Sequence, residues 1–255
     1  MRRTVSCQRT FGILVPKLQL FTLLWEWNLM GINPLKKIRK ILNRSSFSRR
    51  ASERFLSQRS FSIDGSSYEY IVHPHNYTWT NERTVEISIA KACLESHQMM
   101  RILEVGNVSR HYFGGNHDVV DKYEKADGVI NVDIVDYMPS QNYQCIFAIS
   151  TLEHVGWDRD KKEPDKIIQA VDKLKSLLEP DGELMITVPL GFNCFLDEFI
   201  ENNALGFDQY QYLKRVNSQN EWIQSPWQDV RGSQYNAPYP NANAVVVATY
   251  RKPSN

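Results

Sequence analysis

Five short apolar segments between residues 101 and 188 constrain the fold more than any other feature of the sequence. The fourth segment is apolar almost throughout, as expected for a strand that is covered on both faces. A helical repeat of apolar residues over 164–178 separates it from the fifth. Short buried strands joined by helices or tight crossovers predict a parallel sheet in an α/β layer fold. The expected strands are 101–105, 118–123, 128–134, 144–150 and 183–188.

The segments around these strands extend the predicted domain in both directions. A helix is expected over 81–97, before the first strand, and a short helix over 195–202. Residues 209–216 alternate between apolar and polar, which is typical of an edge or antiparallel strand, and 244–251 is a final apolar strand. We expect the stretch between these two strands, which is rich in Trp, Tyr and Pro, to be a loop.

Charge divides the chain into two unlike parts. The whole sequence has 30 basic and 29 acidic residues, a formal net charge of +1. Residues 1–60 hold 13 of the basic residues and only 2 of the acidic ones, so their net charge is +11 and the remainder carries −10. This division predicts a basic N-terminal arm over 1–61 and an acidic α/β domain over 62–255.

The arm contains three different segments. Residues 11–25 are apolar but too short and too interrupted to span a membrane as a helix. Residues 34–42 combine helical apolar spacing with cations, which suits contact with an anionic membrane surface or, as the alternative, a solvated helix. Residues 44–62 are rich in Ser and Arg, and we expect a flexible linker there. The arm has no Lys/Arg face on a recognisable folded module, so nucleic acid is not expected as a partner.

The cysteines are far apart in the sequence. No two of them form a CxxC pair, and no Cys/His cluster has the spacing of a zinc site, so no metal centre is predicted. The pattern favours a reduced, cytoplasmic compartment. If residues 34–42 bind a membrane surface, the protein would be peripheral to that membrane. The four are Cys7, Cys93, Cys145 and Cys194, which are expected to behave as small apolar residues.

Acidic residues follow the predicted strands where the strands end. Parallel sheets bind ligands beyond the carboxyl ends of their strands, and unpaired carboxylates are costly to bury. These acidic side chains are therefore expected to face solvent or a polar ligand, and that ligand could be a cation. They are Glu104, Asp121, Asp133 and Glu153.

Four motifs follow one another along the predicted strands. They are Leu103-Glu104-Val105-Gly106, Asp133 to Pro139 running into Tyr143, Thr151-Leu152-Glu153-His154-Val155, and Leu177 to Leu184. Together they resemble the motifs of class I S-adenosylmethionine-dependent methyltransferases, in the branch that acts on small molecules. The resemblance covers roughly residues 80–190 and implies a Rossmann-like three-layer sandwich. It also implies a mostly parallel seven-stranded sheet with an antiparallel C-terminal strand.

This resemblance implies a role for each residue at the strand ends. Glu104 would hold the ammonium group of S-adenosylmethionine, directly or through water, and Gly106 would let the backbone approach the methionine moiety. Asp121 is our choice for the ribose hydroxyls and Asp133 for adenine, although Asp133 would take the ribose if 118–123 were only a loop. The other expected cofactor contacts are Asn107, Ile134, Ser150 and Thr151.

The implied activity is methyl transfer to a small-molecule or sugar-like acceptor by in-line displacement. His154 and Glu153 are candidates for a general base, with a structural histidine and a helix cap as the alternatives. Trp157 could line the acceptor pocket, although plain packing is the alternative for its ring. The sequence makes no prediction of the oligomeric state.

Two departures keep other functions open. Val108 and Arg110 stand where the family has the second and third glycines of its first motif. A non-catalytic module that keeps the fold and is tethered by the arm is therefore the second hypothesis. A nicotinamide-dependent dehydrogenase is the third, and it is weakened because no G-x-G-x-x-G follows the first strand.

Overall fold

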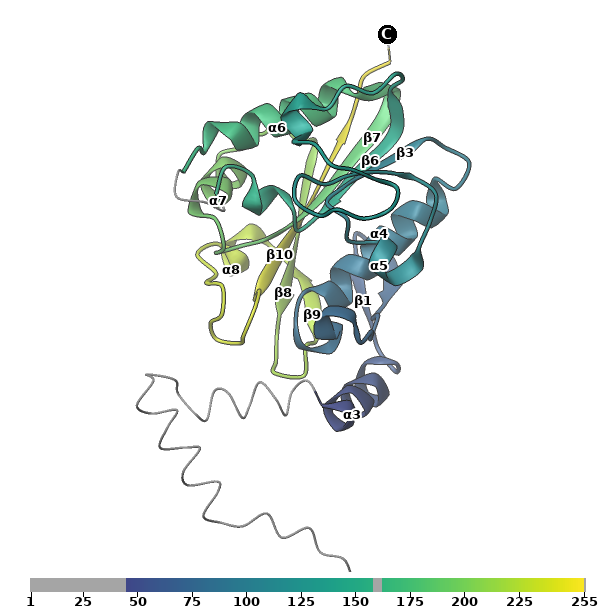
Figure 1. The fold of residues 1–255 in the computed structure, drawn as a ribbon. Coiled ribbons are helices and arrows are strands. Elements are labelled where there is room, and N and C mark those ends of the chain that lie inside the picture. Colours follow the sequence, from purple (N-terminus) through teal and green to yellow (C-terminus); the bar gives the residue numbers. More distant parts are fainter. Residues whose placement is uncertain (1–44, 158–161, 255) are drawn as a thin grey trace, which may run out of the picture. The chain divides into compact units, whose positions relative to one another are not determined.

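The computed structural model describes residues 45–157 and 162–254, and an eight-stranded mixed sheet forms its centre (Figure 1). Five strands run parallel in the order β5-β4-β3-β6-β7. All five were expected, and they confirm the α/β class. Their bounds are β3 Ile102–Val105, β4 Asp118–Val120, β5 Val129–Ile130, β6 Tyr143–Ile149 and β7 Leu178–Pro189.

Three antiparallel strands complete the sheet beyond β7. The C-terminal strand β10 (Ala244–Arg251) lies between β7 and β8 (Gln209–Arg215), so β8 is not an edge strand. The edge is β9 (Trp222–Ser225), which pairs with β8 and makes eight strands where seven were expected. The prediction of a loop there was wrong because β9 has only four residues and does not alternate between buried and exposed positions.

Two hydrophobic clusters, one on each face of the sheet, give the three layers. Alternate residues of β6 contribute to them, with Ile146 and Ala148 in one cluster and Cys145 and Phe147 in the other. The first cluster includes residues of α6 (Asp165–Ser176) and α7 (Cys194–Glu201), and the second includes residues of α4 (Arg83–Ser96). The shorter helices are α5 (Arg110–Phe113), α8 (Trp227–Val230), η1 (His75–Thr80), η2 (Ile134–Asp136) and η3 (Leu152–His154).

The compact unit begins at Ser46, whereas the domain was predicted to begin at residue 62, and part of the predicted linker is helical. Helix α3 (Ser46–Leu56) is followed by β1 (Ser60–Ile63), which pairs with β2 (Ser66–Glu69) in a separate two-stranded sheet. Leu56, Phe61 and Ile63 are buried in the second cluster. Average composition does not indicate such single buried residues in and beside a Ser/Arg-rich stretch.

The apolar segment 11–25 and the basic segment 34–42 lie outside the described residues. Across residues 45–157 and 162–254, no helix has the length and apolar character needed to cross a membrane. The membrane-surface contact predicted for residues 34–42 therefore stays a prediction.

Candidate functional site

A cavity of about 290 Å³ opens at the carboxyl ends of β3, β4 and β6. Its position agrees with the rule that parallel sheets bind ligands beyond these strand ends. Eleven site residues were predicted from the sequence, and Glu104, Glu153 and Trp157 do not line the cavity. The eight that do are Gly106, Asn107, Asp121, Asp133, Ile134, Ser150, Thr151 and His154.

Gly106 makes the turn that leads out of β3. Its φ is +84°, and its N–H donates to the Val120 carbonyl at 2.9 Å, which ties the turn to β4. A Cβ at this position would lie 2.2 Å from Thr151 Oγ1, far inside contact distance. Both the backbone conformation and the close approach of Thr151 therefore require glycine here.

Glu104 points away from the cavity and into the loop that follows β3. Its fully buried carboxylate accepts from the Val108 N–H at 3.0 Å, the Ser109 N–H at 2.5 Å and Ser109 Oγ at 2.7 Å. His117 Nε2 lies 2.9 Å from Oε2, the oxygen that also accepts from Ser109 Oγ. Glu104 therefore does not line the cavity, and its hydrogen bonds hold the loop that follows β3.

Asn107, in this loop, and Asp121, directly after β4, are joined by a hydrogen bond. Asp121 Oδ2 accepts from the Asn107 N–H at 3.2 Å, and its Oδ1 accepts from the N–H groups of Tyr123 and Glu124 at 2.8 Å. The Asn107 amide donates to Glu124 Oε1 at 2.7 Å. Its carbonyl oxygen Oδ1 is buried and has no hydrogen-bond partner among the described residues. A buried acceptor left unpaired in a cavity wall is costly unless a ligand donates to it.

Asp133 shares its carboxylate between two lysines. Its Oδ2 accepts from Lys122 Nζ at 2.7 Å and Lys166 Nζ at 2.6 Å, and its Oδ1 accepts from the Val135 N–H at 3.3 Å. Burial raises the pKa of Asp133, but the hydrogen bonds from the lysines outweigh it and hold that pKa below its usual value. Asp133 is therefore an anion with its charge already compensated.

A buried polar network supports the cavity from behind. Ser150 lines the cavity in a left-handed conformation, with φ of +40°, which is strained for a residue with a side chain. Its hydroxyl donates to Glu86 Oε1 at 2.6 Å, and the Thr187 hydroxyl donates to the same oxygen at 2.8 Å. Arg83 lies 2.5 Å from the second oxygen of Glu86. The strained turn at Ser150 is thus held by helix α4.

The two candidate bases lie in different surroundings. His154 borders the cavity with its side chain 43 % exposed, and its ring meets Phe192 edge to face. Glu153 is 2 % exposed, its Oε1 is 3.8 Å from His154 Nε2, and its Oε2 has no partner in the described chain. Burial raises the pKa of Glu153 well above its usual range. Of the two, His154 lines the cavity and Glu153 does not.

Trp157 lies beyond this pair and packs against α7. Its ring meets Phe195 edge to face at 5.6 Å, and Lys162 Nζ lies 3.7 Å from the ring centroid. These contacts favour the packing alternative over a wall of the cavity.

Sequence reasoning did not single out three charged side chains in the cavity wall. Lys122 directly follows Asp121, Glu124 follows two residues later, and Lys166 comes from the first turn of α6. No motif marks them. Their only signal was proximity to predicted strand and helix ends, where side chains reach the carboxyl edge of the sheet.

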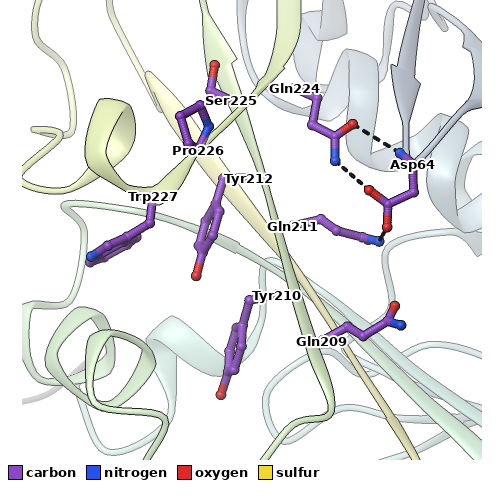
Figure 2. A pocket seen from close by; sticks show the side chains of 9 residues that line it. All are labelled: Asp64, Gln209, Tyr210, Gln211, Tyr212, Gln224, Ser225, Pro226 and Trp227. Carbon is purple, nitrogen blue, oxygen red and sulfur yellow. Dashed lines mark hydrogen bonds between the residues drawn. The ribbon is translucent and has the colours of Figure 1, made fainter.

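Figure 2 shows a second, wider cavity of about 580 Å³, located on the antiparallel part of the sheet. Tyr210, Tyr212 and Trp227 line one part of it, while Asp64 bonds to the side chains of Gln211 and Gln224 in the other. It contains none of the predicted site residues. The cavity at the parallel strand ends is therefore the candidate site despite its smaller volume.

No family model and no curated protein matches the sequence. Among solved structures, the chain is similar to N-methyltransferase NodS from Bradyrhizobium japonicum WM9 in complex with S-adenosyl-L-homocysteine, with 11 % identity. That match covers 68 % of this chain and 87 % of the other, with a TM-score of 0.43. The chain is also similar to 1,6-didemethyltoxoflavin-N1-methyltransferase from Burkholderia thailandensis, with 18 % identity. That match covers 76 % of this chain and 99 % of the other, with a TM-score of 0.39.

A third similar structure is an S-adenosylmethionine-dependent methyltransferase from Thermotoga maritima, described as a possible histamine N-methyltransferase. It is 12 % identical over 66 % of this chain and 87 % of the other, with a TM-score of 0.40. All three structures are distant likenesses of this chain.

Proposed function

We propose that this protein is an S-adenosylmethionine-dependent methyltransferase that moves a methyl group to a small-molecule acceptor. The observation that carries the proposal is the cavity itself. Four sequence motifs imply cofactor contacts scattered from Gly106 to Thr151, and eight of the eleven predicted site residues line one cavity at the carboxyl edge of a parallel sheet.

The residues of the cavity fit the polar groups of this cofactor. The unpaired Oδ1 of Asn107 is an acceptor for the ammonium group, the task first assigned to Glu104. The Asp121 carboxylate, at the end of β4, can accept from the ribose hydroxyls. Val132 and Ile134 offer apolar surface for the adenine ring. The cavity thus offers one neutral acceptor, Asn107 Oδ1, and one carboxylate, that of Asp121, to the donor groups of a ligand that carries positive charge.

When bound, S-adenosylmethionine supplies a methyl group that its sulfonium already activates. The chain's contribution is to bind, to align and to exclude water, since proximity and orientation lower the barrier to displacement. Gly106 and Thr151 define the floor between β3 and β6, and Ser150 is fixed by Glu86. Fixed positions at these strand ends favour a single orientation of both reactants.

We assign His154 as the residue that would remove a proton from an acceptor that must lose one. It borders the cavity, and Glu153 lies beside it as a positioning residue. Glu153 is poorly suited to accept the proton itself, because burial raises its pKa and favours the carboxyl group in its protonated form. Trp157 is retained only as a packing residue.

Calorimetric titration of the full chain with S-adenosylhomocysteine and S-adenosylmethionine tests the proposal directly. We expect one saturable site per chain and a rise in melting temperature with ligand concentration. Absence of heat and of a melting shift up to millimolar ligand would favour the non-catalytic module. A shift with NADH but not with S-adenosylhomocysteine would favour a dehydrogenase.

Asp121→Asn should weaken S-adenosylhomocysteine binding by roughly 10- to 100-fold, because hydrogen bonds to a charged group contribute about 1.5–3 kcal/mol. Asp133→Asn should weaken binding by less than about 3-fold, because Lys122, Lys166 and the Val135 N–H already occupy its carboxylate. Isothermal titration of both variants measures the ratio. The opposite ranking would move the ribose contact from Asp121 to Asp133.

A further inference from the structure

Two cysteines and a histidine that are far apart in the sequence meet on the face of the sheet that α4 covers. Cys93 lies in the last turn of α4, His97 directly follows the last residue of that helix, and Cys145 lies on β6. The two sulfur atoms are 3.5 Å apart, and Cys93 Sγ is 4.0 Å from His97 Nδ1. One donor atom from each residue lies within 4.8 Å of the others. The two cysteines are 52 positions apart in the sequence, which explains why sequence spacing did not reveal the cluster.

The cluster is separate from the proposed methyl-transfer site. Cys145 is the third residue of β6, at its amino end, whereas Ser150 follows the carboxyl end and lines the cavity. Helix α4 connects the two regions, with Glu86 near its start bonded to Ser150 and Cys93 near its end. The inference therefore does not depend on the proposed function.

We propose that Cys93, His97 and Cys145 bind a thiophilic divalent metal ion, with zinc as the expected occupant. Two thiolates on one zinc ion, each about 2.3 Å from it in tetrahedral geometry, lie about 3.8 Å apart, close to the separation found here. Thiolate and imidazole ligands together select zinc among the abundant divalent ions.

A carboxylate lies near the second ring nitrogen of His97. Nδ1 faces Cys93, while Nε2 lies 3.9 Å from Glu183 Oε2. Glu183 is the direct neighbour of Cys145 across the β6–β7 pair, so its carboxylate is on the same face. Histidine ligands commonly donate their second N–H to a carboxylate, which orients the ring, and a small shift of Glu183 would allow that bond. Metal binding would replace the present contacts of Nδ1 with the Cys93 carbonyl at 2.8 Å and with Ser96 Oγ at 2.9 Å.

Metal binding at this cluster requires both thiols to be deprotonated and the imidazole to be neutral, so protons are released when the ion binds. The affinity for the metal ion should therefore rise with pH.

Titration of the full chain, reduced and freed of metal by a chelator, with Zn²⁺ tests the proposal. We expect one Zn²⁺ per chain with Kd of about 1 µM or tighter, and Co²⁺ should give the absorption bands of thiolate ligation. Cys93→Ser and His97→Gln should each weaken Zn²⁺ binding at least about tenfold. Both residues are only partly buried, which favours folded variants, and circular dichroism checks this.

Cys194→Ser is the matched control, because this cysteine is exposed and lies on α7, outside the cluster. It should leave the stoichiometry and affinity unchanged. The proposal is overturned if the reduced chain binds no Zn²⁺, or if binding survives in both Cys93→Ser and His97→Gln. A chain that yields a Cys93–Cys145 disulfide but binds no Zn²⁺ after reduction would overturn it as well.

Discussion

Gly106→Ala should weaken S-adenosylhomocysteine binding at least about 100-fold, which corresponds to about 2.8 kcal/mol. Alanine at a φ of +84° is strained by about 1–3 kcal/mol, and its Cβ would meet Thr151 Oγ1 at 2.2 Å. Relief of that overlap requires the turn after β3 or Thr151, two residues after β6, to move. Both border the cavity, so its shape changes wherever the strain is released. Calorimetric titration of the variant measures the loss.

Two further variants separate the overlap from the strain. Thr151→Ala in the Gly106→Ala background removes the contacts at 2.2 and 2.9 Å and leaves one at 3.1 Å, so binding should recover at least about tenfold. Gly65→Ala is the matched control, because Gly65 has a φ of +79° and no atom within 4 Å of the added Cβ. It should lower stability without changing affinity. If Gly106→Ala binds as tightly as Gly65→Ala, the cavity is not the cofactor site.

The strand ends explain how the sequence could locate the cavity. Parallel strands bring their carboxyl ends to one edge, so Gly106, Asp121 and Thr151 could be placed together once the strands were recognised. The direction of a side chain at such an end is set by competing partners. Glu104 found four donors in its own loop, whereas Asn107 kept one acceptor unpaired. Position was predictable from the chain, and hydrogen-bond partners were not.

The errors in the fold have a common physical cause. Helix α3 and strand β9 are short segments whose order depends on a few buried side chains, among them Leu56 and Trp222, packed against distant parts of the chain. Periodicity and composition average over a window of residues and do not detect single anchors. The thiol cluster was missed for the same reason, since only the packing of α4 on β6 brings Cys93 to Cys145.

Glu86→Ala should lower the free energy of unfolding by about 3–5 kcal/mol, because removal of one partner from a buried ion pair leaves the other charge uncompensated. Glu86 is fully buried and bonded to Arg83, Ser150 and Thr187. Alanine would leave two hydroxyl donors and a guanidinium without this acceptor. The variant should also weaken S-adenosylhomocysteine binding, because Ser150 loses the bond that holds its strained turn. Urea denaturation measures the first effect and calorimetry the second.

Glu95→Ala on the same helix is the control for this prediction. Glu95 is 58 % exposed and 3.7 Å from Lys91, and such surface pairs contribute less than about 1 kcal/mol. Glu86→Gln keeps an acceptor for the hydroxyls and removes only the charge, so its cost should lie between those of the two alanine variants. If Glu86→Ala costs no more than Glu95→Ala, the ion pair of Glu86 with Arg83 does not stabilise the fold as argued here. Ser150 would then hold its conformation through the hydrogen bond of its N–H to Thr187 alone.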